Sequence, residues 1–397
     1  MATNPAPHEY DCFVKETFDS PHEEFARLRK ECPVAHSNDF GGFWIATRYD
    51  DVVQMLEDGD NYITSVRNIV PASSSTARTP PLHFDPPQHT PYRKALERAL
   101  SRGRISSLVP SIHKHSNELI DAFIERGEGD FVEHVGSWLP TLVFGDWMGL
   151  KEEQTKHLWW LARTYIRAWV NWDKDRVMEM LDGMFEMARE VVADRRANPR
   201  DPNVDPTSSL LATVLDDGSK IPDNLLESCT RQVLIIGLTA PPMVFSSMAI
   251  YLSRNPELYA KLHADPSLAP DAMEEFLRLF TPYRGFARTS KKPVDWYGRT
   301  IQPGEPICLA FASANRDETK FEDPHEFKLK RPNINDHVAF GLGAHRCVGM
   351  PVARLQMGIA LQTLLKKVKK IEPAGEIVMS GMPELGPVTA PIRVTPA

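Results

Sequence analysis

The sequence predicts a single, mostly α-helical domain over residues 1–397 that carries small β-sheets. From residue 91 to about 280, apolar residues recur at spacings of three and four, which is the period of helices that bury one face. After residue 290, turn signals such as Tyr297-Gly298 and Pro303-Gly304 separate short β-prone runs. Because the helices do not alternate with strands, a doubly wound parallel sheet is not expected.

The first part of the chain mixes strands with short helices. Ser20 followed by Pro21 is typical of a helix start, because serine caps helices and proline suits the first helical position. The apolar segment 43–48 predicts a strand, and 49–58 predicts a short helix. We therefore expect a β-rich part over about 40–65.

A long apolar segment dominates the middle of the chain. The uncharged stretch from Val233 to Leu252 is as long as a membrane span, but it contains glycine, two prolines and serines in mid-chain. We expect it to be the buried central helix, beginning near Pro222, of a protein without a membrane span. The last third predicts a helix over about 270–280, a final helix from near Gly349 to near Lys369, and β-rich parts over about 290–312 and 375–397.

Composition narrows the possible functions. The formal net charge of -7 and the pI near 6.0 argue against nucleic acid as a partner. Five widely spaced cysteines without a CxxC pair predict no disulfide framework and a reducing compartment. With no signal peptide at the N-terminus, the expected location is the cytoplasm.

The clearest chemical signal is the segment Phe340–Gly349, FGLGAHRCVG. Gly341 and Gly343 permit positive φ and let the backbone approach a flat ligand. A tight loop just before a helix directs several N–H groups to one place, and such donors stabilise a thiolate. Cys347 is therefore a candidate ligand, although a lone cysteine is more often a small buried hydrophobe.

This segment resembles the cysteine-ligand loop of the cytochrome P450 superfamily, of the soluble bacterial type. The resemblance implies a haem b cofactor whose iron is bound by the Cys347 thiolate, with Phe340 packed near the sulfur. Such a ligand pushes electron density onto the iron and favours O–O cleavage. The positions that match without a gap are Phe340, Gly343, His345, Arg346, Cys347 and Gly349.

Two further motifs occur in the family's order. Glu275 and Arg278 resemble the family's Glu-x-x-Arg pair, and Arg331 would complete its buried, structural ion network. Asp85-Pro86-Pro87 resembles the approach to the family's C helix. The resemblance implies that the haem propionates are held by His89, Arg93, Arg288 and His345, and arginine suits carboxylates chemically.

The central helix departs from the family pattern. That pattern is glycine, any residue, an acid and then threonine, and the acid and alcohol deliver protons by general acid catalysis. Here Gly237 is followed by Leu238, by Thr239 at the acid position and by Ala240 at the alcohol position. Proton delivery therefore does not use the usual pair.

Several routes stay open at this helix. Pro241 and Pro242 lack N–H groups, so we expect a kink with ordered water on the freed carbonyls, and water with Thr239 or a substrate hydroxyl would then carry protons. Peroxide use is an alternative, although no arginine lies between Gly237 and Ser253. Coupling or rearrangement chemistry, or a non-catalytic haem sensor, are the others.

The resemblance also implies where a substrate would bind. The expected pocket segments are 62–88, 159–185, 233–243, 281–287 and the residues near Met382. The stripe of Tyr165, Trp169 and Trp172 is more often core than pocket, and Phe286 and Val244 are plausible pocket contacts. We expect a small apolar or aromatic organic molecule to be oxidised with O2.

A basic segment suggests a protein partner. Residues 92–104 carry Arg93, Lys94, Arg98, Arg102 and Arg104 against Glu97 alone. This segment is either a solvated helix face or a docking site for an acidic electron donor. Because the chain shows no flavin or nucleotide motif, electrons are expected from a separate ferredoxin or flavodoxin with its reductase.

Overall fold

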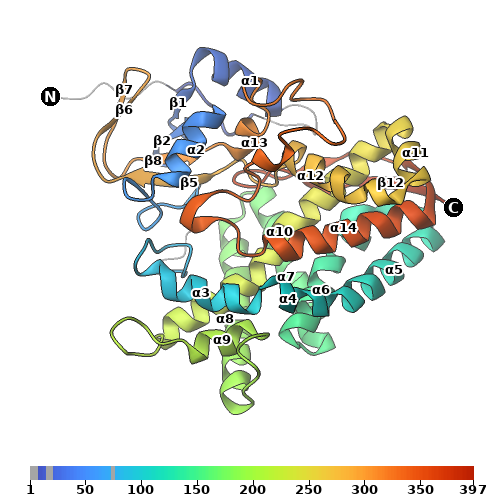
Figure 1. Cartoon of the computed structure of the whole chain (residues 1–397), viewed down its shortest axis with the longest axis horizontal. Helices are drawn as coiled ribbons and strands as arrows, with labels where there is room; N and C mark the ends of the chain where they lie inside the picture. The colour runs from blue at the N-terminus through green and yellow to red at the C-terminus, as the bar shows by residue number, and fades with distance from the viewer. Residues whose placement is uncertain (1–7, 15–20, 73–76) are drawn as a thin grey trace.

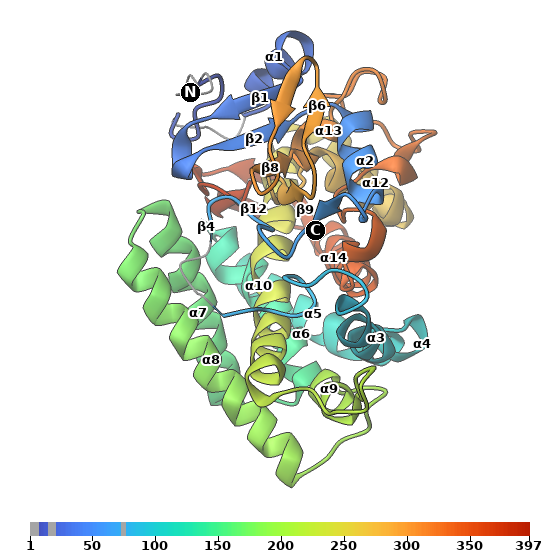
Figure 2. The same ribbon diagram turned by 90° about the vertical axis from the view of Figure 1, so that its left-hand side faces the viewer.

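The computed structural model describes residues 8–14, 21–72 and 77–397, without the side chains of Arg102, Arg104 and Ile236. The expected cap Ser20 therefore lies outside the described residues. Strands and short helices gather at one end of the molecule, and long helices form the other end (Figures 1 and 2).

Long helices make up most of the fold. Their ends follow from the sequence: the Asp173 carboxylate accepts from the Arg176 N–H at the start of α8, and Gly149 ends α6 with a left-handed φ of 58°. The helices are α1 Pro21–Glu31, α2 Tyr49–Glu57, α3 His89–Ala99, α4 Arg102–Ile105, α5 Val109–Arg126, α6 Trp138–Met148, α7 Glu152–Val170, α8 Lys174–Ala197, α9 Pro206–Ala212, α10 Asp223–Arg254, α11 Pro256–Ala264, α12 Ala269–Leu279, α13 Phe311–Ala314 and α14 Met350–Lys367.

The strands form four small sheets. The largest has the order β1-β2-β8-β5-β3, with β2 parallel to β8 and the other neighbours antiparallel. A second has the order β4-β12-β9, and the pairs β6-β7 and β10-β11 stand alone. The strands are β1 Val34–Ser37, β2 Phe43–Ala46, β3 Tyr62–Ile63, β4 Glu128–Asp130, β5 Phe286–Ser290, β6 Val294–Trp296, β7 Arg299–Ile301, β8 Pro306–Leu309, β9 Val368–Pro373, β10 Val378–Met379, β11 Pro387–Thr389 and β12 Pro391–Pro396.

Helix α10 is the centre of the molecule. It passes between α6, α7, α8 and α9 and also contacts α14 (Figure 2). Its apolar window is long enough to cross a membrane, but 82% of that window is buried within the fold. The expectation of a buried central helix is therefore confirmed. The helix runs through Pro241 and Pro242 as one element, and the kink with its water stays a prediction.

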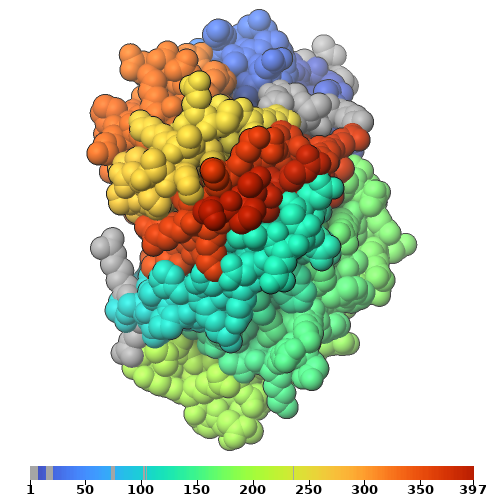
Figure 3. Space-filling view, turned by 90° about the vertical axis from the view of Figure 1, so that its right-hand side faces the viewer, coloured from blue at the N-terminus to red at the C-terminus, as the bar shows by residue number. Residues whose placement is uncertain are grey.

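Some boundaries differ from the sequence-based expectation. The final helix ends at Lys367 rather than near Lys369, because Val368 already pairs in β9. Strands β1 and β4 were not expected, since their pairing depends on partners elsewhere in the chain. Helix α14 and the C-terminal strands lie against α5 at the surface (Figure 3). The main hydrophobic core therefore lies between α5, α10 and α14.

Candidate active site

The loop before α14 holds Cys347 in a fixed backbone turn. The Cys347 N–H donates to the Phe340 carbonyl at 2.8 Å, which closes the loop. Gly341 and Gly343 have φ values of 64° and 67°, which glycine adopts without strain. A Cβ on Gly343 would lie 2.4 Å from the Leu56 carbonyl oxygen at the end of α2. Glycine at this position is thus required by both conformation and space.

The Cys347 thiol is half-buried and faces a cavity. Burial raises its pKa, while the N–H groups of Gly349 and Met350 and the guanidinium of Arg93 act in the opposite direction. These donors lie where α14 begins, as expected for a loop that stabilises a thiolate. The N–H groups and Arg93 therefore offset part of the cost that burial imposes on a negatively charged sulfur.

The cavity at Cys347 lies between α3, α6, α10 and α14. Its walls are mainly apolar, and on the far side Phe144 presses against Gly237 of α10, where a Cβ would meet the ring at 2.2 Å. Gly237 therefore lets α6 and α10 approach closely beside the cavity. The apolar lining includes Leu82, Leu96, Phe144, Val233, Val348 and Val352.

Basic side chains gather at one edge of this cavity. His89 and His345 are in ring contact, with centroids 4.6 Å apart. The buried Nε2 of His89 has no hydrogen-bond partner among the described residues, and burial lowers its pKa to about 4. Arg288 is 5% exposed and donates to the Ala287 carbonyl, and burial lowers its pKa to about 10. Arg93 pairs with Glu97 at 2.7 Å and also donates to the Arg346 carbonyl.

Asp85 is a fixed acid beside these cations. Its carboxylate accepts from the Thr64 and Ser65 N–H groups at 2.9 and 3.1 Å and lies 3.6 Å from His345 Nε2. Burial raises its pKa, but hydrogen bonds from His345, Ser65 and Thr64 outweigh burial and hold the pKa well below its ordinary value. Sequence reasoning placed Asp85 only within a motif and missed this role.

The expected ion network is assembled in the core. Glu275 binds Arg278 at 2.7 Å and Arg331 at 3.0 Å, and all three side chains are almost fully buried. Burial raises the Glu275 pKa, yet its two arginines leave the pKa below the ordinary value. Arg278 also donates to the carbonyls of Asn315 and Pro324. The network thus ties α12 to the irregular segment that precedes the cysteine loop.

Glu274 forms a second link that the sequence did not reveal. It accepts from Arg354 of α14 at 2.6 Å and lies 3.0 Å from His337 Nε2. Burial raises its pKa, but hydrogen bonds from His337 and Arg354 lower it to about 2. Arg354 also lies over the Phe340 ring, 5.0 Å from its centroid. Helix α12 therefore fixes both ends of the cysteine loop.

A pair of hydroxyls in hydrogen-bond contact joins Thr239 of α10 to Tyr283. Thr239 Oγ1 is 2.8 Å from the Tyr283 phenol oxygen, and Tyr283 pairs through its backbone with Glu384. Burial raises the Tyr283 pKa far above its ordinary value and raises the Glu384 pKa to about 7. Ala240, at the family's alcohol position, contributes no hydroxyl. Tyr283 and Glu384 were not among the predicted site residues.

Comparisons with known proteins decide the family. A family model described as Cytochrome P450 matches residues 146–386. The chain belongs to the cytochrome P450 family. A steroid C26-monooxygenase from Mycolicibacterium smegmatis is 31% identical over 94% of this chain and 93% of its own. A linalool 8-monooxygenase from Pseudomonas putida is 28% identical over 89% and 90%.

A solved P450 shares the whole architecture. The structure of CYP109Q5 from Chondromyces apiculatus superposes with a TM-score of 0.84 at 27% identity and covers 96% of both chains. The expected fold, mostly helical with small sheets in a single domain, is thus confirmed. As a P450, this protein is an oxidoreductase of a monooxygenase family that binds haem b through a cysteine thiolate.

The residues present fit that cofactor. The Cys347 sulfur opens onto an apolar cavity beneath α10. Two groups at its edge form no ion pair within the described chain, although Asp85 lies near both: the orphaned His89 Nε2 and the buried Arg288, which hydrogen-bonds only a carbonyl. A haem carries carboxylate groups at one edge and an apolar ring otherwise, so both halves of the site match it chemically.

The residues expected to contact the substrate lie in different surroundings. Val244 is 2% exposed and packs in the main core with Phe131 and Phe245, so the structure gives no support to its pocket contact. Phe286 is half-buried and packs on Tyr283. Trp169 is buried in a small cluster with Tyr165 and Trp172 at its edge.

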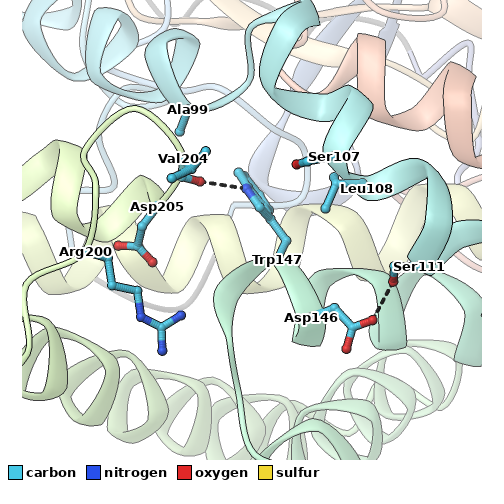
Figure 4. Close-up of a pocket in the computed structure, with 9 residues that line it drawn as sticks. All are labelled: Ala99, Ser107, Leu108, Ser111, Asp146, Trp147, Arg200, Val204 and Asp205. Carbon is cyan, nitrogen blue, oxygen red and sulfur yellow. Dashed lines mark hydrogen bonds between the residues drawn. The ribbon is translucent and has the colours of Figure 1, made fainter.

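A separate hollow opens at the surface between α5, α6 and the segment before α9 (Figure 4). Trp147 lines both this hollow and the Cys347 cavity and donates to the Val204 carbonyl at 3.0 Å. Asp146 accepts from Ser111 and lies 2.8 Å from His115 Nε2. The lining of this hollow includes neither Cys347 nor the basic residues beside it, so the hollow is distinct from the Cys347 cavity.

Proposed function

We propose that this P450 is a monooxygenase that oxidises a small, mainly apolar or aromatic organic molecule with O2. Cys347 would hold the haem iron through its thiolate, with Phe340 and Gly349 beside the sulfur. The haem, when bound, supplies the O2 activation that is needed to oxidise an unreactive C–H bond. The observation that carries this proposal is the Cys347 sulfur facing an apolar cavity from a loop closed by positive-φ glycines. The propionate partners are His89, Arg93, Arg288 and His345.

The substrate class rests on the pocket segments and on relatives. Tyr165, Trp169 and Phe286 place aromatic surface in segments that the family uses for substrate. Two relatives are a steroid C26-monooxygenase and a linalool 8-monooxygenase, and steroids and linalool are mainly apolar molecules. Burial of such a molecule expels water from the site, and this water exclusion strengthens the local hydrogen bonds.

Proton delivery is proposed to use Thr239 and Tyr283 in place of an acid and a threonine. Thr239 occupies the family's acid position, and its hydroxyl is in hydrogen-bond contact with the Tyr283 phenol. Glu384, whose pKa burial raises to about 7, holds a proton within the same buried region near neutral pH. A carboxyl that titrates near the working pH is suited to proton transfer. The two hydroxyls would then pass protons towards Gly237 and Ala240 on α10.

The electron donor is proposed to be a separate acidic protein, a ferredoxin or flavodoxin, that docks on α3. Arg93 contacts the Arg346 carbonyl in the cysteine loop, and Lys94 and Arg98 are exposed on the same helix. The side chains of Arg102 and Arg104 lie outside the described ones. A positive surface next to the cysteine loop would steer an acidic electron donor to the side of the protein where Cys347 lies.

Turnover separates this function from its alternatives. Reconstituted enzyme would be given a terpene, a steroid and an aromatic substrate with isotopically labelled O2, reduced ferredoxin and ferredoxin reductase. Labelled hydroxylated product, formed only with reductant, is the expected result. Product formed with hydrogen peroxide but not with reductant would establish the peroxide route, unlabelled rearranged or coupled product would establish the third chemistry, and ligand binding without product would leave a sensor.

A further inference from the structure

A buried arginine of α10 lies beside the expected substrate segments without an acidic partner among the described residues. Arg231 of α10 is 9% exposed, and its Nε is buried with no hydrogen-bond partner in the described part of the chain. Its Nη2 donates to Thr79 Oγ1 at 3.1 Å, and its guanidinium stacks on Phe185, 4.7 Å from the ring centroid. A hydroxyl and an aromatic ring leave its charge uncompensated.

Several buried arginines of this fold pair with a carboxylate, whereas Arg316 bonds only the Leu279 carbonyl and His325 among the described residues. Arg278 and Arg331 share Glu275, while Arg195 binds Asp205 at 3.0 Å. Arg231 differs from these and resembles Arg288, which bonds only a carbonyl and faces the expected propionate edge. Burial lowers the Arg231 pKa, and the nearby Tyr165 phenol acts in the opposite direction. A buried cation in this state is stabilised by an anion that arrives with a ligand.

The surroundings of Arg231 are the expected substrate segments. Thr79 belongs to the loop 62–88, while Tyr165 and Phe185 stand on α7 and α8. Gln232 and Val233, the next residues on α10, line the Cys347 cavity. Arg231 precedes Gly237 by six residues, which is about 9 Å of helix. Arg231 therefore lies on α10 directly before residues that line the Cys347 cavity.

Two hydroxyl groups lie beside the Arg231 guanidinium and could bind the same negatively charged group. Thr79 Oγ1 also lies 3.3 Å from Ser228 Oγ, so these two hydroxyls and the guanidinium form one group. Arginine binds carboxylates through paired N–H donors, and one guanidinium balances one carboxylate. The aromatic rings of Tyr165 and Phe185 complete a site that is charged at one point and apolar elsewhere.

We infer that Arg231 is a substrate-anchoring residue that binds the carboxylate of an aromatic or alicyclic acid and points its apolar end towards Cys347. This inference rests on the proposed function and narrows its substrate class. The substrate is an organic acid whose carboxylate stays intact while the distant C–H bond is oxidised. A neutral terpene or steroid would leave the guanidinium unpaired and would bind less well.

Matched acids and amides test the anchor in the holoenzyme. The Soret spin shift is titrated with 4-tert-butylbenzoate, indole-3-acetate and decanoate, each against its primary amide. At least one acid is expected to bind about tenfold or more tightly than its amide. Arg231→Gln removes this preference without changing amide affinity, and Arg231→Lys keeps part of it. The exposed Arg189→Gln on α8 is the control and keeps the full preference.

Two results would overturn the anchor. One is that no acid of the panel is favoured over its amide, and the other is that Arg231→Gln weakens acid and amide equally. A structural role is checked separately: Arg231→Met is expected to leave the ligand-free Tm unchanged or raised, and a clear fall would mean that the arginine only holds the 77–84 loop. If labelled hydroxylated product still forms with O2 and reductant, the proposed function stands whichever result is found.

Discussion

Thr239 Oγ1 and the phenol oxygen of Tyr283 are 2.8 Å apart, across 44 residues of sequence. The contact places a paired hydroxyl at the position where the family usually has an acid. Because burial raises the Tyr283 pKa far above its ordinary value, the phenol stays protonated at neutral pH and can donate. The missing acid–threonine pair is thus accompanied by another hydrogen-bonded pair on the same helix.

Removal of either hydroxyl is expected to disturb proton delivery. Thr239→Val and Tyr283→Phe should each lower the product formed per electron pair by about tenfold, because general acid groups contribute at least this much. The measurement is product against reductant consumed, together with the solvent deuterium isotope effect. Thr230→Val on the same helix, whose hydroxyl has no partner among the described residues, is the control. Unchanged coupling in both variants would rule out this pair.

Glu384 is expected to make stability depend on pH. Burial raises its pKa from 4.5 to about 7, so the folded state binds this proton more tightly than the unfolded state. Its contribution is therefore greatest below pH 4.5 and is lost as the pH rises to about 7. Glu384→Gln should be more stable than the wild type above this range by up to about 3 kcal/mol.

Urea unfolding across this pH range measures the difference between the two proteins. The exposed Glu376→Gln, which lies on the same C-terminal segment, serves as control and should show no such trend. If Glu384→Gln and wild type had parallel pH profiles, Glu384 would be ionised at neutral pH and could not be a proton source.

The buried ion network is expected to be essential for the fold. Glu275→Gln leaves Arg278 and Arg331 without a carboxylate in a dry core, which costs about 3–5 kcal/mol. The variant should show a lower Tm and a reduced haem content after purification. The exposed pair of Glu152 and Lys156 is the comparison, and Glu152→Gln should change Tm little. Equal effects of the two substitutions would contradict the structural role of the network.

Charge reversal on α3 tests the docking surface. Lys94→Glu and Arg98→Glu are expected to slow reduction by an acidic ferredoxin, and the difference from the wild type should shrink at high salt because screening removes the steering. Stopped-flow reduction is the measurement, and Arg189→Glu, exposed on α8, is the control. Reduction rates that the α3 variants share with the control would place the donor elsewhere.

The sequence predicted those features that depend on local pattern. The glycines of the cysteine loop occupy positive-φ positions that few other residues adopt. Glu275 and Arg278 are three residues apart, a spacing that places two side chains side by side on a helix. The apolar run of α10 likewise predicted a buried central helix, and 82% of its window is buried. The ion network needed only one distant partner, Arg331, to complete it.

Features that depend on tertiary packing could not be predicted. Tyr283 and Glu384 meet through a bridge between segments about a hundred residues apart, and neither carries a local motif. Val244 looked like a pocket residue because of its place on the central helix, but the helix turns that face into the core. The sequence also did not reveal that Arg231 lacks an acidic partner among the described residues, because its contacts Thr79 and Phe185 lie far from it in the chain.

The most direct test of the account is the Soret spectrum of the reduced carbon monoxide complex of Cys347→Ser. The wild type and the control Cys32→Ser should both give the strongly red-shifted band of a thiolate ligand. Cys32 suits the control because its thiol is half-buried and lies far from Cys347 in the sequence. Cys347→Ser should lose that band while it still binds haem. A red-shifted band that persists in Cys347→Ser would contradict the assignment of Cys347 and, with it, the proposed site.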